Sequence, residues 1–174
     1  MVTKKSFLII VGILAFMGLL LGSATQSEAE TMKLRVSNVV TKGEGFPVGD
    51  VEGHNLAFLT RDGVAVLENG EVGSMKALVI NDVMPKGGSF LGYLVLTLVD
   101  GSAIVLSFQR CTFSPDPEGK LAFIQQGSGE LVNGSGRFKG IKGTMSMTGK
   151  VLKPTKEEVA GKAYNDFTLT YTLP

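Results

Sequence analysis

Residues 127–148 read GSGELVNGSGRFKGIKGTMSMT, and this stretch decides the fold. Its last eight residues alternate: Ile141, Gly143, Met145 and Met147 are small or apolar, and Lys142, Thr144, Ser146 and Thr148 are polar. Successive side chains of a strand point to opposite faces, so this period of two predicts a strand with one buried face. The glycines before it permit a tight turn outside a strand, because glycine accepts backbone angles that other residues avoid.

The same alternation recurs along the chain after residue 30. The clearest turns are Arg61-Asp62-Gly63, Glu68-Asn69-Gly70 and Asp100-Gly101, because Gly and Asn accept the positive φ of hairpin turns. Between the turns we expect strands at 32–40, 54–60, 63–68, 71–83, 89–99, 101–113, 120–126, 141–148 and 166–173. No window keeps the spacing of an amphipathic helix for more than two turns.

This pattern predicts an all-β chain of about eight antiparallel strands, most of them joined to their neighbours. Eight such strands can close into an up-and-down barrel, which leaves no exposed edge and has room for a packed interior or one small ligand. Phe138 can plug one end of the barrel. The hairpin at 89–109 carries apolar residues on both faces, so we expect its outer face to pack against another subunit.

A pattern G-x-G-x-F-x-G-x-x-G runs through the opening stretch from Gly134 to Gly143. It resembles the signature of the allene oxide cyclase and dirigent barrel superfamily, here in a bacterial-type exported form. The resemblance extends back through Gly119–Phe123 and Asp100-Gly101-Ser102, and covers about two thirds of the chain after residue 29. It implies an eight-stranded barrel, often trimeric, with a short helical turn near 134–140, an apolar substrate in the lumen and no metal or organic cofactor.

The resemblance also bears on two residues of the first strand. In the plant cyclases, a Glu on this strand and an Asn two residues later lie in the barrel cavity. The corresponding positions here are Val36 and Asn38. The resemblance therefore implies a barrel with a cavity, in which Val36 replaces the ionisable group.

The first 29 residues have the plan of a secretory signal. Lys4 and Lys5 precede an unbroken apolar run from Phe7 to Leu21, and small residues follow it. As a helix the run would be about 22 Å long, short of the roughly 30 Å hydrocarbon core, which favours cleavage over a membrane anchor. We expect a signal helix over 1–29, a barrel domain over 30–174, no membrane contact after cleavage, and a periplasmic or extracellular location.

Composition excludes several classes of site. The single cysteine, Cys111, rules out an intramolecular disulfide framework and a thiolate zinc cluster, and its place in an apolar strand pattern predicts a buried thiol. The single histidine, His54, leaves one imidazole for catalysis or ligation. A net charge of +1 gives no reason to expect nucleic acid as a partner.

Asp50, Glu52 and His54 alternate along the chain, so an extended backbone would place all three on one face. Two carboxylates and an imidazole could hold a divalent metal or form an acid/base pair. Gly49 and Gly53 favour a loop with solvated side chains instead, so we keep the three as acid/base candidates and predict no metal site.

Asn38, Tyr93 and Arg110 are our candidates for polar groups that contact a ligand in the lumen. An amide, a phenol or a guanidinium inside an apolar barrel can orient a ligand, because such pockets contain few polar groups. Each is equally compatible with an ordinary strand position.

Three functions fit these observations. The first is an exported barrel that binds a small apolar or amphipathic molecule, without a cofactor and as a possible dimer or trimer. The second is a cofactor-free cyclase or isomerase that acts by the shape of its cavity. The third is a structural or interaction barrel with a filled lumen. A continuous cavity of some hundreds of Å³ along the axis would separate the first two from the third.

Overall fold

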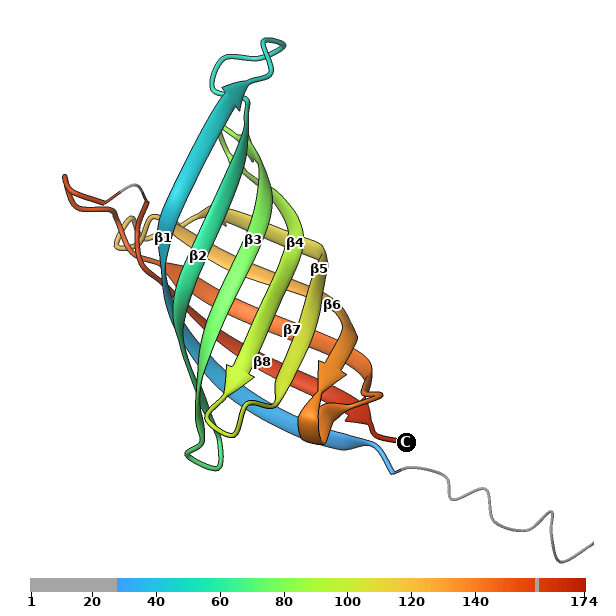
Figure 1. Cartoon of the computed structure of the whole chain (residues 1–174). Coiled ribbons are helices and arrows are strands. Elements are labelled where there is room, and N and C mark those ends of the chain that lie inside the picture. Colours follow the sequence, from blue (N-terminus) through green and yellow to red (C-terminus); the bar gives the residue numbers. More distant parts are fainter. Residues whose placement is uncertain (1–27, 159) are drawn as a thin grey trace, which may run out of the picture.

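The computed structural model describes residues 28–158 and 160–174 as a closed barrel of eight antiparallel strands (Figure 1). The strands are β1 (Glu30–Pro47), β2 (Asn55–Leu67), β3 (Val72–Met84), β4 (Gly87–Leu98), β5 (Ala103–Pro115), β6 (Phe123–Ser135), β7 (Lys142–Val151) and β8 (Ala163–Thr172). Each strand pairs with the next, and β8 pairs with β1 to close the barrel. The predicted all-β, up-and-down barrel is confirmed.

A 3-10 turn, η1 (Gly136–Phe138), follows β6, where we expected a short helical turn. No helix within the described part of the chain is long and apolar enough to cross a membrane. The expected signal helix falls almost wholly on residues 1–27, which lie outside the described residues. Its cleavage and the export of the protein stay predictions.

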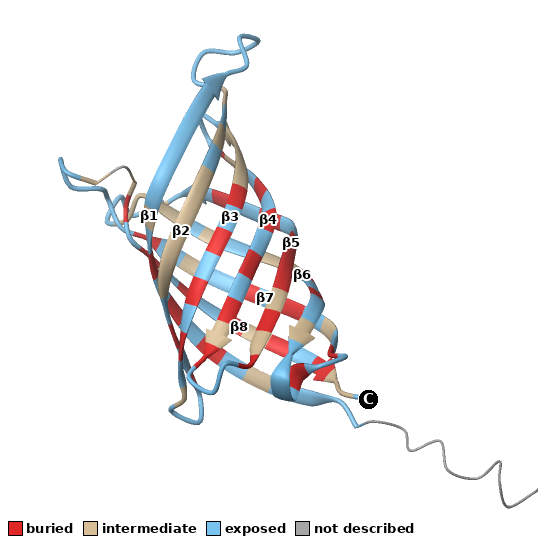
Figure 2. Ribbon diagram, viewed as in Figure 1, coloured by how far each residue is buried: buried red, intermediate tan, exposed pale blue. Residues whose placement is uncertain are grey.

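Inward and outward residues alternate along the strands, as Figure 2 shows. The inward set is almost entirely apolar and forms one continuous core. Its fully buried side chains include Val36, Leu94, Leu96, Ile104, Leu106 and Leu169. Burying this apolar surface is the main force that holds the barrel together.

One end of the barrel is plugged by Phe138 of η1, which is 3% exposed and packs edge-on against Tyr171 with ring centroids 6.4 Å apart. The neighbouring Arg137 holds the plug in place from outside. Its Nη1 atom donates a 2.8 Å hydrogen bond to Glu71 at the β2–β3 turn and lies 3.5 Å from Asp100 at the β4–β5 turn. Three connections at this end of the barrel are therefore tied together.

The expected turn at Arg61-Asp62-Gly63 is wrong, because β2 runs through it without a break. Gly63 faces Asn38 across the β1–β2 pair, and a Cβ at this position would overlap the carbonyl oxygen of Ser37 and the side chain of Asn38. The glycine therefore allows two strands to approach closely and does not form a turn.

The glycines at 127 and 129 also lie in a strand, where we expected a turn. A Cβ at Gly127 would overlap Cys111 of β5, and one at Gly129 would overlap the carbonyl oxygen of Ser107. The turn begins only at Gly136, whose φ of +61° favours glycine. Gly127 and Gly129 therefore mark close contacts between strands, and Gly136 marks the turn.

The β1–β2 hairpin extends beyond the barrel as an arm (Figure 1). Here β1 continues to Pro47, well past the expected end at Val40, and a register shift lies between Val40 and Lys42. Phe46 and Phe58 pack edge-on on this arm with centroids 6.0 Å apart, and both are largely exposed.

The outer face of the β4–β5 hairpin is apolar, as the sequence indicates. Leu91 and Tyr93 are 54% and 57% exposed, and Leu78 of β3 lies opposite Tyr93. Packing of this face against another subunit stays a prediction.

Cys111 is buried, as predicted, and burial raises the pKa of its thiol from 9.0 to about 11. We expect the thiolate population at pH 8 to be about a hundredfold lower in the folded protein than in the unfolded chain. The rate of reaction with a disulfide reagent, measured with and without guanidinium chloride, tests this. Rapid reaction of the folded protein would contradict the burial of Cys111.

Candidate functional site

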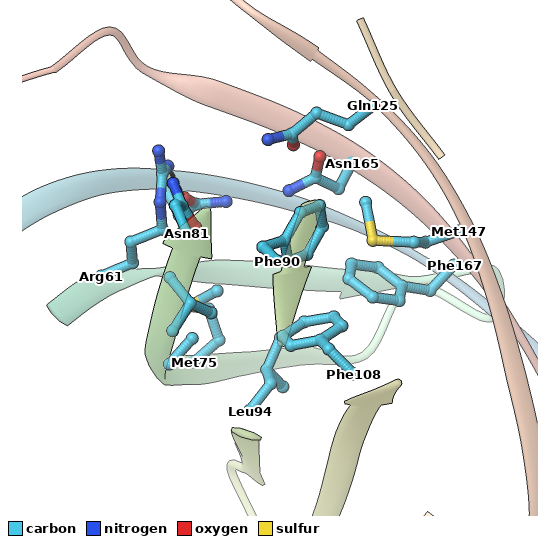
Figure 3. A pocket seen from close by; sticks show the side chains of 13 residues that line it. Arg61, Met75, Asn81, Phe90, Leu94, Phe108, Gln125, Met147, Asn165 and Phe167 are labelled. Atoms are coloured by element: carbon cyan, nitrogen blue, oxygen red, sulfur yellow. Dashed lines mark hydrogen bonds between the residues drawn. The ribbon is translucent and has the colours of Figure 1, made fainter. Parts of the chain in front are cut away.

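Five polar side chains gather inside the barrel at the end opposite η1, and we call them the polar cluster. They come from five strands and line one cavity, and Figure 3 labels four of them, Arg61, Asn81, Gln125 and Asn165. The members are Asn38 of β1, Arg61 of β2, Asn81 of β3, Gln125 of β6 and Asn165 of β8. Each occupies an inward position of its strand. Most other inward positions of the barrel carry apolar residues.

Apolar walls lie beneath the polar cluster (Figure 3). Phe90 and Phe108 pack edge-on with centroids 5.5 Å apart, and Phe167 lies 6.3 Å from Phe108. Met75 and Met147 complete much of the wall. The lumen is thus polar near one end and apolar below it.

The cavity that these residues enclose has a volume of about 30 Å³, room for about two water molecules. It is far smaller than the several hundred Å³ by which we expected to recognise a ligand cavity. In this conformation, aromatic and methionine side chains fill most of the lumen.

Arg61 is the one charged residue that lines this cavity. Its Nη1 atom donates a 2.6 Å hydrogen bond to Oδ1 of Asn38. No carboxylate of the described residues forms an ion pair with it. Burial lowers the pKa of the Arg61 guanidinium to about 10, so the group stays cationic at neutral pH.

Two buried amide atoms in the polar cluster have no hydrogen-bond partner among the described residues: Nδ2 of Asn38 and Oδ1 of Asn165. The two residues are 2% and 8% exposed. A buried polar group without a partner costs about 1–3 kcal/mol, so such groups in folded proteins usually meet water or a ligand.

Two glycines leave room for the polar cluster. A Cβ at Gly63 would overlap Asn38, and a Cβ at Gly149 of β7 would overlap Oδ1 of Asn165 and lie 3.3 Å from Gln125. Neither glycine has a positive φ, so the close approach of neighbouring groups is the reason for glycine at both positions.

The structure separates the three residues that we expected in the lumen. Asn38 lies there, two residues after Val36, which is fully buried. Tyr93 and Arg110 instead point outward and are exposed, so the structure corrects their expected place in the lumen. A register shift in β5 between Phe108 and Arg110 turns Cys111 inward and leaves Arg110 outside.

The acid/base candidates lie on the arm, outside the lumen. Nδ1 of His54 is 2.6 Å from Asp50, and its Nε2 is 2.8 Å from Asp82 of β3. Glu52 is exposed in the same loop. Among the described residues, no group of three or more His, Cys, Asp or Glu side chains could hold a metal ion.

His54 makes both contacts as a donor only when it is an imidazolium, and hydrogen bonds with Asp82 and then Asp50 raise its pKa. Because the folded-state pKa is raised, the stabilisation is fully present below pH of about 6.5 and is lost as pH rises through the folded-state pKa. We expect wild type to melt above His54→Gln at pH 5.5 and to lose this advantage progressively as the pH rises through the folded-state pKa of His54. Glu52→Gln, in the same loop, is the control. An advantage that is independent of pH would contradict the assignment.

Four members of the polar cluster were not among the residues singled out from the sequence. Arg61 falls within the turn that the sequence predicts at Arg61-Asp62-Gly63. Asn81 continues the inward series of Ala77 and Val79, and Asn165 precedes that of Phe167 by two residues. A polar residue at a position where the alternation predicts a buried side chain could therefore have indicated Asn81 and Asn165.

No protein-family model matches the chain, and no curated protein matches it. Solved structures of two pterocarpan synthase dirigent proteins are similar to it. GePTS1 is 12% identical, with 87% of this chain and 93% of that chain covered and a TM-score of 0.45. PsPTS1 is 14% identical, with 84% of this chain and 97% of that chain covered and a TM-score of 0.45.

Proposed function

We propose that the barrel binds a small amphipathic molecule in its lumen, with the polar end of the molecule at the polar cluster. The observation that carries the proposal is the pair of buried amide atoms, on Asn38 and Asn165, that have no partner in the described structure. A ligand group that accepts a hydrogen bond from Nδ2 of Asn38 and donates one to Oδ1 of Asn165, as a hydroxyl can, would satisfy both atoms. The apolar part of the ligand would then face Phe90 and Phe167.

The small cavity requires side chains to move when a ligand larger than about two waters enters. Met75 and Met147 line the cavity, and methionine is the apolar side chain that repacks most readily. Arg61 and Gln125 are partly exposed and have several rotatable bonds. These four side chains could therefore widen the lumen without a change in the strands.

Binding is a better proposal than a reaction that requires proton transfer in the lumen. The residues that line the cavity include no Asp, Glu, His or Tyr that could exchange a proton with a substrate. Val36, the position at which the family resemblance implies a Glu in the plant cyclases, is apolar and fully buried.

We also propose that the chain is a distant relative of the allene oxide cyclase and dirigent barrels. The support is the Gly134–Gly143 pattern, in which Gly136 and Phe138 form the plug of the barrel. The proposal extends to the fold alone, and it assigns no substrate.

A structural barrel with a filled lumen is the second candidate, and the cavity of about 30 Å³ favours it. On this alternative, ordered water satisfies the polar cluster, and no organic molecule enters. The two candidates differ in whether an amphipathic molecule stabilises the folded protein.

We expect octanoate or 1-octanol to raise the thermal midpoint of the purified protein, because a ligand at a hundred times its dissociation constant stabilises the folded state by about 2.7 kcal/mol. Gln125→Leu removes a member of the polar cluster and should weaken the effect. Gln126→Leu, which changes the exposed neighbour, is the matched control. No stabilisation by either compound, at concentrations up to their solubility, would favour the filled barrel.

A further inference from the structure

We propose that the ligand is a singly charged organic anion, with a carboxylate bound by Arg61. This inference rests on the proposed function, and it adds the charge and chemical class of the ligand. It follows from where the strands place their charged side chains at this end of the barrel.

Acidic residues follow three members of the polar cluster directly in sequence, and all three lie on the outer face. Asp62 accepts a hydrogen bond from Thr41, Asp82 accepts one from His54, and Asp166 pairs with Arg35. Side chains alternate along a strand, so the acids face outward wherever the polar cluster faces inward. The cation is left inside, and its possible counter-ions are outside.

Arg61 retains donors for a ligand. Its hydrogen bond to Asn38 uses Nη1, and the planar guanidinium carries five N–H groups in a fork that matches a carboxylate. The unpartnered Nδ2 of Asn38 is a further donor beside it. The amide of Asn165 can turn over without changing its shape and so present its NH2 group to the same anion.

One cation favours a single negative charge. A phosphate dianion would leave about one charge unpaired in a mostly apolar lumen, which is strongly unfavourable. A carboxylate is planar, carries one charge and can end an apolar chain that runs toward Phe90 and Phe108. The order of polar and apolar groups along the lumen therefore fits a carboxylic acid with an aliphatic or aromatic body.

Calorimetry with three eight-carbon probes, octanoate, 1-octanol and octylammonium, tests the inference on the purified full protein. We expect octanoate to bind at least tenfold more tightly than 1-octanol, and octylammonium to bind most weakly. Arg61→Gln should remove the preference for octanoate. Arg110→Gln, an exposed arginine on the outer face, is the matched control and should leave the preference unchanged.

The outcomes separate the inference from the proposed function. Equal affinity for octanoate and 1-octanol in wild type would overturn the inference that the ligand is an anion, but it would leave the proposal of binding in the lumen intact. Absence of binding by all three probes would overturn the proposed function. If Arg61→Gln keeps the preference for octanoate, a group other than Arg61 binds the carboxylate, and the assignment of Arg61 is overturned. If Arg61→Gln does not fold, Arg61→Lys keeps the charge, and loss of bidentate geometry should weaken octanoate binding but not 1-octanol binding.

Discussion

Replacing Phe138 with alanine is expected to lower the free energy of unfolding by about 3–5 kcal/mol, the usual range for a large aromatic residue removed from a core. Phe138 is 3% exposed, contacts Tyr171 edge-on, and has the guanidinium of Arg137 5.1 Å from its ring centroid. Alanine at this position would leave a void at the plugged end of the barrel and admit water to the core beneath it.

Chemical denaturation of wild type and Phe138→Ala measures the effect, and Phe46→Ala is the control. Phe46 is 47% exposed on the arm, so its loss should change stability much less. Equal effects of the two substitutions, or a loss below about 1 kcal/mol for Phe138→Ala, would show that η1 does not seal the core.

Most of the fold can be predicted from the period-two pattern, because that pattern reports the burial of each face directly. Met145 and Met147 of β7, and Phe167 and Leu169 of β8, lie inward as their alternation predicts. The glycines could not be interpreted in the same way. Gly63 resembles a turn residue in the sequence, and the need for it appears only when β1 lies beside β2.

The site was harder to predict for the same reason. Asn38 was found through a family resemblance, whereas Arg61 was hidden in the supposed turn that Gly63 indicated. Arg110 and Tyr93 are polar residues on expected strands, as Asn38 is, yet the side chains of both lie on the outer face of the barrel. Inward or outward position depends on strand register and on irregularities such as the one after Phe108, and those are set by pairing between distant segments.

The second large effect concerns the stability of the protein without ligand. We expect the double variant Arg61→Met, Asn38→Leu to be more stable than wild type by about 1–3 kcal/mol, the usual cost of a buried polar group that has no partner. The change removes an uncompensated cation and the unpartnered Nδ2 atom together. The same variant should lose its preference for octanoate over 1-octanol.

Both substitutions are needed for the full gain in stability. Arg61→Met alone removes the donor to Oδ1 of Asn38, and an unsatisfied buried acceptor costs about 1–3 kcal/mol. The single variant should therefore gain less than the double variant, and the difference measures the coupling of the two side chains. Arg110→Met is the exposed control, with an expected change within about 0.5 kcal/mol. If the double variant is instead less stable than wild type, the polar cluster contributes to folding itself.

A gain in stability joined to a loss of binding is the result expected of a site kept for a ligand, because a group retained for function is under no requirement to stabilise the empty protein.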